Sequence, residues 1–249
     1  MKTVYSILMI LLLIIVCIGC GHTAQDHIDL GLAKFNLADD KGAIAEYNMA
    51  LEIDNDNSDA YSGRGYARTE LLDYNGAIAD FNKAIEINHM NANAYSGRGV
   101  TKIFLKDFNS AIDDFNKAIK INPYSADPYA GRGGAKIAIQ DYIGAITDCT
   151  KAIEINTKAA KAFYYCYRGI AKALNYTKNK SNNNLEGIDR GIDDLTCAIN
   201  IDPKQLEAYY WRGIIKIGLN QRESGCLDLG KSGELGFPLA YEAIKNYCQ

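Results

Sequence analysis

Small and apolar residues recur along the chain with the spacing of helix faces, and the whole pattern returns after 34 residues. The segment YSGRG of residues 61–65 returns at this shift as 95–99 and, with one change, as 129–133. A second apolar-periodic segment, residues 76–88, also returns at the same shift. A short stretch containing an aspartate separates the two segments of each period. Each period therefore predicts two helices joined by a turn.

The repeated positions hold particular kinds of residue. A glycine recurs in the first segment of each period, as Gly31, Gly65, Gly99, Gly133, Gly169 and Gly213. An aromatic residue precedes it in five units, and alanines follow at two later positions, as Ala43, Ala77, Ala111 and Ala145 and as Ala50, Ala84, Ala118, Ala152 and Ala198. This pattern resembles the tetratricopeptide repeat, a 34-residue helix-turn-helix unit. The resemblance implies an all-α fold, a right-handed superhelical solenoid of stacked helix hairpins.

On this register, residues 24–238 form six units, with bounds 24–57, 58–91, 92–125, 126–159, 162–205 and 206–238. The fifth unit carries an insertion, 177–186, between its two helices. The insertion has two interpretations, a tolerated loop at a hairpin tip or a contact for a partner. Residues 239–249 predict a final capping helix, with Leu239, Ala243 and Ile244 laid on the last hairpin.

The chain begins with an apolar run, residues 4–19, that follows Lys2. The run is short for a membrane-spanning helix and is typical of a secretory signal, which we assign to residues 1–19. Gly19 followed by Cys20 resembles the end of a bacterial lipoprotein signal. The resemblance implies lipidation of Cys20, a tether at residues 20–23 and a membrane-anchored lipoprotein of the bacterial cell envelope, at either the inner or the outer membrane. The alternative is an uncleaved signal anchor, which also tethers the protein to a membrane.

Charge and motif content exclude several classes of function. The chain has 27 Lys plus Arg against 30 Asp plus Glu, a net charge of −3, so a basic nucleic-acid binder is not expected. The three histidines lie far from any metal-ligand pattern, and the sequence has no HExxH motif and no phosphate-binding loop. We therefore expect no metal, no cofactor and no enzymatic activity.

Charged residues repeat with the same period. An arginine directly precedes the repeated glycine in every unit except the first, and an acid recurs on each second helix; the expected members of this ladder are Glu46, Arg64, Asp80, Arg98, Asp114, Arg132, Asp148, Arg168, Asp194 and Arg212. The first unit has Leu30 in place of the arginine. We predict that each acid pairs with the arginine of the next unit, because the first unit then needs no arginine. Ligand binding by the arginines is the alternative.

The resemblance also implies a concave groove lined by the first helix of each unit. The groove candidates are Ser62, Tyr66, Ser96, Val100, Phe104, Tyr167, Tyr210 and Trp211. The leading hypothesis is a membrane-anchored scaffold that binds a protein or peptide in this groove. The alternative is a carbohydrate- or peptidoglycan-binding lipoprotein that uses Tyr167, Tyr210 and Trp211 for stacking, and self-association is a third.

Five cysteines follow Cys20, namely Cys149, Cys166, Cys197, Cys226 and Cys248. Export beyond the cytoplasm permits disulfides. Cys226 and Cys248 belong to the last hairpin and its cap, and we expect them to form a pair if the cap runs antiparallel to the helix that it covers. The alternative is two free thiols. The sequence leaves the redox state of Cys149, Cys166 and Cys197 open.

Overall fold

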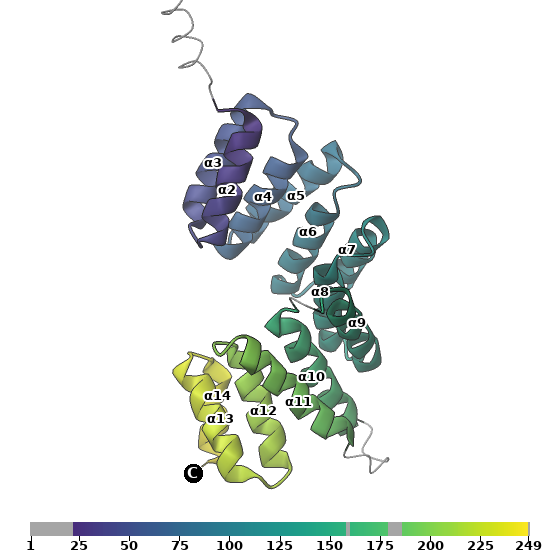
Figure 1. Cartoon of the computed structure of the whole chain (residues 1–249), viewed down its shortest axis with the longest axis vertical. Helices are drawn as coiled ribbons and strands as arrows, with labels where there is room; N and C mark the ends of the chain where they lie inside the picture. Colours follow the sequence, from purple (N-terminus) through teal and green to yellow (C-terminus); the bar gives the residue numbers. More distant parts are fainter. Residues whose placement is uncertain (1–21, 158–159, 179–185, 249) are drawn as a thin grey trace, which may run out of the picture. The chain divides into compact units, whose positions relative to one another are not determined.

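The computed structural model describes residues 22–157, 160–178 and 186–248. All regular elements within these ranges are α-helices, and they follow one another as antiparallel hairpins (Figure 1). The helices are α2 (Ala24–Asn36), α3 (Asp40–Ile53), α4 (Ser58–Glu70), α5 (Tyr74–Ile87), α6 (Ala92–Phe104), α7 (Phe108–Ile121), α8 (Ala126–Ala138), α9 (Tyr142–Ile155), α10 (Ala162–Lys178), α11 (Glu186–Ile201), α12 (Leu206–Gly218), α13 (Arg222–Glu234) and α14 (Pro238–Tyr247). The expected all-α stack of helix hairpins is confirmed.

Some sequence predictions fall outside the described residues. The signal peptide and Cys20 lie there, as do the middle residues of the expected insertion, 179–185. The two ends of that insertion are helical, because α10 continues through Lys178 and α11 begins at Glu186. None of the described helices is both long and apolar enough to cross a membrane.

The chain divides into two compact units, residues 1–97 and 98–249. The first unit contains α2 to α5 and the first part of α6. The second contains the rest of α6 and α7 to α14. Each unit is a stack in which a helix packs against its hairpin partner and against a helix of the adjacent hairpin.

Two local devices end the first helix of a hairpin and begin the second. The residue two positions before the second helix adopts a left-handed backbone, as Ala38, Leu72, Lys106, Gln140 and Asn220 do with φ between 58° and 64°. The N–H of Asp73 then donates to the carbonyl oxygen of Arg68, which closes the turn after α4. The carboxylate of the same Asp73 accepts from the backbone N–H of Gly76 at 3.0 Å and so caps α5.

We expect Leu72→Gly to raise the free energy of unfolding by about 0.5 to 1 kcal/mol, because glycine adopts a left-handed backbone without steric cost. Leu72 is 70% exposed, so little packing is lost. Leu71→Gly is the matched control. Leu71 has φ of −81°, so glycine brings no relief there and should lower the free energy of unfolding. Urea unfolding of both variants measures the effect, and equal changes in the two would contradict the explanation.

The packing between hairpins in the first unit rests on aromatic rings set against glycines. Phe81 of α5 is fully buried, and an added Cβ on Gly65 would lie 2.9 Å from its ring. On Gly97, at the next hairpin, an added Cβ would lie only 2.4 Å from the same ring. Phe81 therefore fills the space that two glycines leave open, one in its own hairpin and one in the following hairpin.

The second unit begins with the same arrangement and then inverts it. Phe115 packs between Gly99 and Gly131, as Phe81 does between its glycines. One hairpin later, Cys149 stands at the register of Phe115, and Tyr167 stands at the register of Gly131. At the earlier junction the large ring, Phe115, belongs to the second helix of the preceding hairpin. At this junction the large ring, Tyr167, belongs to the first helix of the following hairpin. One large and one small side chain therefore fill the space between the hairpins in both cases, but the helices that supply them are exchanged.

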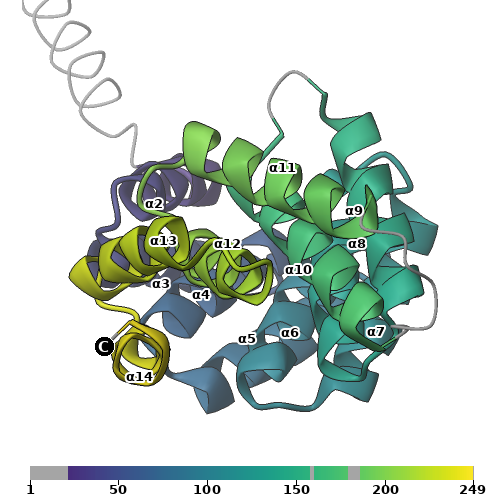
Figure 2. The same ribbon diagram turned by 90° about the horizontal axis from the view of Figure 1, so that it is seen from below.

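The last helix, α14, covers the end of the second unit beside α12 and α13 (Figure 2). Its buried residues are Ala240 and Ala243, and the hydroxyl of Tyr241 donates to the carbonyl oxygen of Gly233 at 2.8 Å. Of the three residues expected on the hairpin, Ala243 is buried and Ile244 is half-buried, whereas Leu239 is 52% exposed. Small residues allow the short helix to lie close to α13, and Ala240 is fully buried there.

Candidate binding face

The contacts between helices identify the inner side of the second unit. From α8 onward, the first helix of one hairpin touches the first helix of the next: α8 packs against α10, and α10 packs against α12. Helix α12 also contacts α14. Among the described residues of this unit, no second helix contacts another second helix. The stack therefore curves toward its first helices, and we call their exposed side the inner face.

Three groove candidates lie on this inner face. Phe104, at the end of α6, is 54% exposed. Val100, one turn earlier, is half-buried and packs against the core formed by Ala111, Phe115 and Ala135. On α12, the half-buried Tyr210 packs edge to face against Trp211, with ring centroids 5.6 Å apart. An aromatic and apolar surface is thus available on the first helices of this unit.

The ring of Phe237, which is not among the predicted groove residues, extends this aromatic surface. Its centroid lies 5.0 Å from that of Tyr210 in a tilted edge-to-face contact. Phe237 directly precedes α14, and therefore the position of the capping helix decides the surroundings of Tyr210. Burial raises the pKa of the Tyr210 phenol, with a smaller contribution from the nearby Tyr247 and Glu242. The helix-start proline that follows Phe237 is the sequence signal that points to this ring.

The two serines among the groove candidates are buried, so their assignment to the groove is wrong. Ser62 is 4% exposed, donates to the Ser58 carbonyl oxygen at 2.9 Å and accepts from the Asn91 amide at 3.1 Å. The Asn91 amide also donates to the Ser58 hydroxyl. This polar cluster joins α4 to the loop before α6. Ser96 is 8% exposed and is also unavailable to a ligand.

Tyr66 has a structural role at the same junction of the first unit. Its ring packs edge to face on Phe81, with centroids 5.2 Å apart. Its hydroxyl donates to the carbonyl oxygen of Asn93 at 2.8 Å. The ring and the hydroxyl therefore both tie α4 to the first turn of α6.

Tyr167 is largely enclosed within the hairpin stack. Its ring lies 5.8 Å from that of Phe163, and an added Cβ on Gly134 would come within 3.0 Å of it. Burial raises the pKa of its phenol to about 12. Trp211 also packs against the core of α10 to α12. Sugar stacking needs open ring faces, and so the packing of Tyr167 and Trp211 disfavours the carbohydrate-binding alternative.

The charge ladder exists, but its pairing differs from the prediction. Each arginine binds the acid of its own helix hairpin: Arg132 donates from Nε and Nη2 to both carboxylate oxygens of Asp148, at 2.8 and 2.6 Å. The same two-point contact occurs in four other hairpins, as Arg64–Asp80, Arg98–Asp114, Arg168–Asp194 and Arg212–Asp228. The predicted pairing of each acid with the arginine of the next hairpin is therefore wrong.

The arginines nevertheless bridge to the preceding hairpin through a neutral partner. Nη1 of Arg132 donates to the side-chain oxygen of Asn116, and Nη1 of Arg64 donates to that of Asn48, both at 2.6 Å. Threonines take this role for Arg168 and Arg212. The partner of these arginines in the preceding hairpin is thus an amide or a hydroxyl instead of the predicted acid. In the part of the chain that the structure describes, no hairpin precedes α2, and Leu30 stands at the arginine position there.

A second cation completes each cluster. It lies one helical turn after the arginine and contacts the same buried aspartate, as Lys136 does with Asp148 at 2.9 Å. The equivalent residues are Arg68, Lys102, Lys172 and Lys216. Each of these residues follows its arginine by four positions, and this spacing in the sequence would have indicated that both cations lie on one face of the first helix.

The first hairpin uses a different set of residues for the same purpose. Glu46 accepts from Lys34 at 2.6 Å and contacts the ring nitrogen Nδ1 of His27 at 2.7 Å. The hydrogen bond from Lys34 and then that from His27 lower the pKa of the Glu46 carboxyl. No buried side-chain nitrogen or oxygen among the described residues lacks a hydrogen-bond partner. The ladder is therefore a set of satisfied structural contacts, which supports the structural interpretation of the arginines over ligand binding.

The cysteines fall into two classes. Cys226 and Cys248 form a disulfide, the pair expected from the sequence, with Cα atoms 5.7 Å apart. Cys149, Cys166 and Cys197 are free thiols. Burial raises the pKa of Cys149 to about 12 and also raises that of Cys166, so these two thiols are unreactive core residues. In the described ranges, no group of three or more His, Cys, Asp or Glu side chains is arranged to hold a metal ion.

The comparisons with known proteins identify the repeat. Residues 65–102 match a family model described as TPR repeat, and residues 92–125 match the tetratricopeptide repeat model. The chain contains tetratricopeptide repeats. Outside the matched residues, the hairpins α8–α9, α10–α11 and α12–α13 carry the same cluster of an arginine, an aspartate and a lysine. No protein of curated function matches the sequence at a significant level.

Solved structures show the same fold at low sequence identity. The chain resembles the APC/C hetero-tetramer Cut9–Hcn1 with a TM-score of 0.79 and 14% identity, over 91% of its own length but only 43% of that chain. PilF of Pseudomonas aeruginosa matches with a TM-score of 0.69 and 15% identity, over 90% of this chain and 96% of that one. YrrB, described as a TPR protein with an unusual peptide-binding site, matches with a TM-score of 0.54 and 20% identity, over 80% and 97%. At these low identities, the matches show that the folds are similar and no more. The repeat fold is a scaffold suited to protein interaction.

Proposed function

We propose that the protein is a membrane-anchored scaffold of the bacterial cell envelope that binds a protein or peptide on the inner face of the second unit. The observation that carries the proposal is the exposure of Phe104 on this face, next to the half-buried Val100. A large apolar side chain exposed on a curved helix face is stabilised when a partner removes it from water. Aromatic side chains of this kind dominate the binding energy of many protein interfaces.

The aromatic group on α12 supplies a second contact on the same side. Tyr210 and Trp211 are held by their mutual packing and by Phe237, so their rings lose little conformational freedom when a partner binds. The peptide-binding site named for YrrB supports this use of the fold, since that protein matches over 80% of the present chain. The proposed ligand is therefore a polypeptide segment with apolar side chains.

Substitution of the inner-face aromatics tests this function. We expect Phe104→Ala and Tyr210→Ala each to weaken capture of the partner by about tenfold or more, because each removes an apolar anchor. Tyr124→Ala is the matched control, since Tyr124 is 84% exposed in the turn between α7 and α8. The measurement is quantitative crosslinking in solubilised envelope fractions, with circular dichroism to verify the fold.

Equal capture by all three variants would reject the inner face as the binding site. Recovery of the chain itself as the captured partner would establish the self-association alternative in place of a foreign ligand. Loss of capture in Tyr124→Ala alone would show that the partner binds the turns between hairpins instead of the inner face.

The proposed membrane anchor rests on the apolar run before Cys20 and on the Gly19–Cys20 pair. We expect the mature protein to begin at Cys20 and to carry two or three acyl chains, because one chain alone binds a bilayer only weakly. Intact-mass measurement of protein extracted from membranes tests this directly. A Cys20→Ser variant should lose the added mass. A mature protein that begins elsewhere, without lipid, would overturn the anchor.

A further inference from the structure

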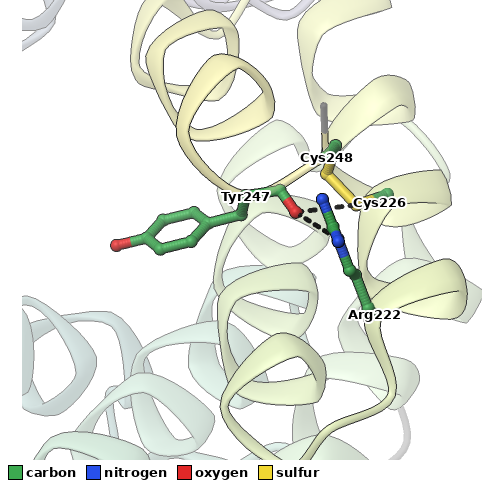
Figure 3. The surroundings of a disulfide bond; sticks show 4 residues. All are labelled: Arg222, Cys226, Tyr247 and Cys248. Carbon is green, nitrogen blue, oxygen red and sulfur yellow. Dashed lines mark hydrogen bonds between the residues drawn. A yellow bond between two sulfur atoms is a disulfide. The ribbon is translucent and has the colours of Figure 1, made fainter.

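The disulfide between Cys226 and Cys248 closes the C-terminal end of the second unit. Cys226 lies in the first half of α13, and Cys248 is the C-cap residue that follows Tyr247 at the end of α14. The bond therefore ties the free end of the capping helix back to the hairpin that it covers (Figure 3). The other end of α14 follows directly from α13 through Phe237.

The disulfide borders an open hollow of about 530 Å³ on the protein surface. Both cysteines line this hollow together with Arg222, Glu223 and Leu227. Leu227 is 72% exposed, so an apolar contact lies next to the sulfur atoms. A thiol carried on another protein has room to approach this bond, whereas the thiols of the α9 and α10 core are buried.

Arg222 places a positive charge at the same position. Its Nε donates to the carbonyl oxygen of Tyr247 at 2.7 Å, which holds the guanidinium group beside the disulfide (Figure 3). A neighbouring cation stabilises a thiolate and so makes it a better leaving group. Access, an apolar contact and a cation are therefore combined at one disulfide.

We propose that Cys226–Cys248 is a thiol–disulfide exchange site for a protein dithiol of the CxxC type. The thiolate of the dithiol attacks one sulfur, the S–S bond breaks, and the other cysteine leaves as a thiolate that then takes up a proton. The second thiol of the dithiol attacks the mixed disulfide and releases the remaining cysteine. The dithiol is thereby oxidised to a disulfide, and Cys226 and Cys248 are reduced to two thiols.

Exchange at this site controls the capping helix. Helix α14 has only ten residues and buries only Ala240 and Ala243. A helix of this length has little stability of its own, so opening the disulfide loosens α14 from its C-terminal end. Phe237 caps the opposite end of α14 and packs on Tyr210, so loosening that reaches the first turn of α14 alters the aromatic group on the inner face.

Trapping of the mixed disulfide tests the exchange step. The probe is thioredoxin with its second active-site cysteine replaced by serine, added to the folded full-length chain. We expect a covalent complex whose linked peptide contains Cys226 or Cys248. Arg222→Gln should slow its formation about three- to tenfold, whereas Arg222→Lys should keep the rate, because lysine retains the charge. Absence of the complex, or its formation only in denaturant, would overturn the proposal.

Hydrogen exchange tests the consequence for α14 without reference to any ligand. The C226S/C248S double variant represents the reduced state. We expect its α14 amides to exchange about tenfold faster than in the disulfide form, while amides of α8 and α9 keep their protection. Unchanged protection of α14 would show that the disulfide does not hold the helix and would overturn the control of the inner face.

Discussion

Replacing Tyr167 with glycine should lower the free energy of unfolding by about 4 kcal/mol, because it opens a cavity and places glycine within a helix. Cys149→Phe should cost about 2 kcal/mol, since Cys149 is fully buried and the added ring overfills its site. Combining the two should cost less than Tyr167→Gly alone. The double variant recreates the arrangement of Phe115 and Gly131 one hairpin earlier, and its measured coupling should be about 3 kcal/mol.

Urea unfolding of the wild-type chain, both single variants and the double variant provides this cycle. The reciprocal exchange, Phe115→Cys with Gly131→Tyr, is the matched control in the same unit and should show coupling of the same sign. Additive costs in both cycles would show that the ring and its facing residue do not share one packing space. Coupling in one cycle only would limit the volume exchange to that junction.

Arg132→Ala should lower the free energy of unfolding by about 3 kcal/mol, because it removes a two-point partner from a buried carboxylate. The side chain of Asp148 is 5% exposed, and Lys136 alone remains to neutralise it. The substitution also removes the hydrogen bond to Asn116. Arg132→Lys should cost about half as much, since it keeps the charge but loses the two-point geometry.

A double-mutant cycle assigns the partner. Arg132 should couple strongly with Asp148 and weakly with Asp114 of the preceding hairpin, in line with the geometry. The opposite ranking would restore the pairing between units. Lys136→Ala serves as a control for charge alone and should have a smaller effect than Arg132→Ala, because a lysine offers no fork of donors to the carboxylate.

The positions that only the structure could assign depend on how neighbouring helices face each other. Ser62 stands at a groove register in the sequence, but Asn91 reaches back and encloses its hydroxyl. Tyr167 was assigned to the groove because it lies on the first helix of its repeat, but its ring is enclosed at the junction beside Gly134, where the buried Cys149 replaces a large ring. In both cases the deciding contact joins residues of different hairpins. Sequence periodicity shows which residues are equivalent, but it does not show which equivalent positions meet.

The sequence by itself determined the helix hairpins and their period, and it indicated Cys226 and Cys248 as the candidate disulfide pair, which the structure then showed to be bonded. Each hairpin follows from local chemistry, namely helix-face periodicity, a capping aspartate and small residues where helices approach closely. The tertiary structure decided the partner of each arginine and the side of the stack on which each aromatic ring lies. Arg132 reaches Asp148 and Asn116 at once, because one guanidinium group has enough donors for two hairpins. Its choice of acid depends on the distance between packed helices, and a repeated sequence is equally compatible with pairing inside a hairpin and between hairpins.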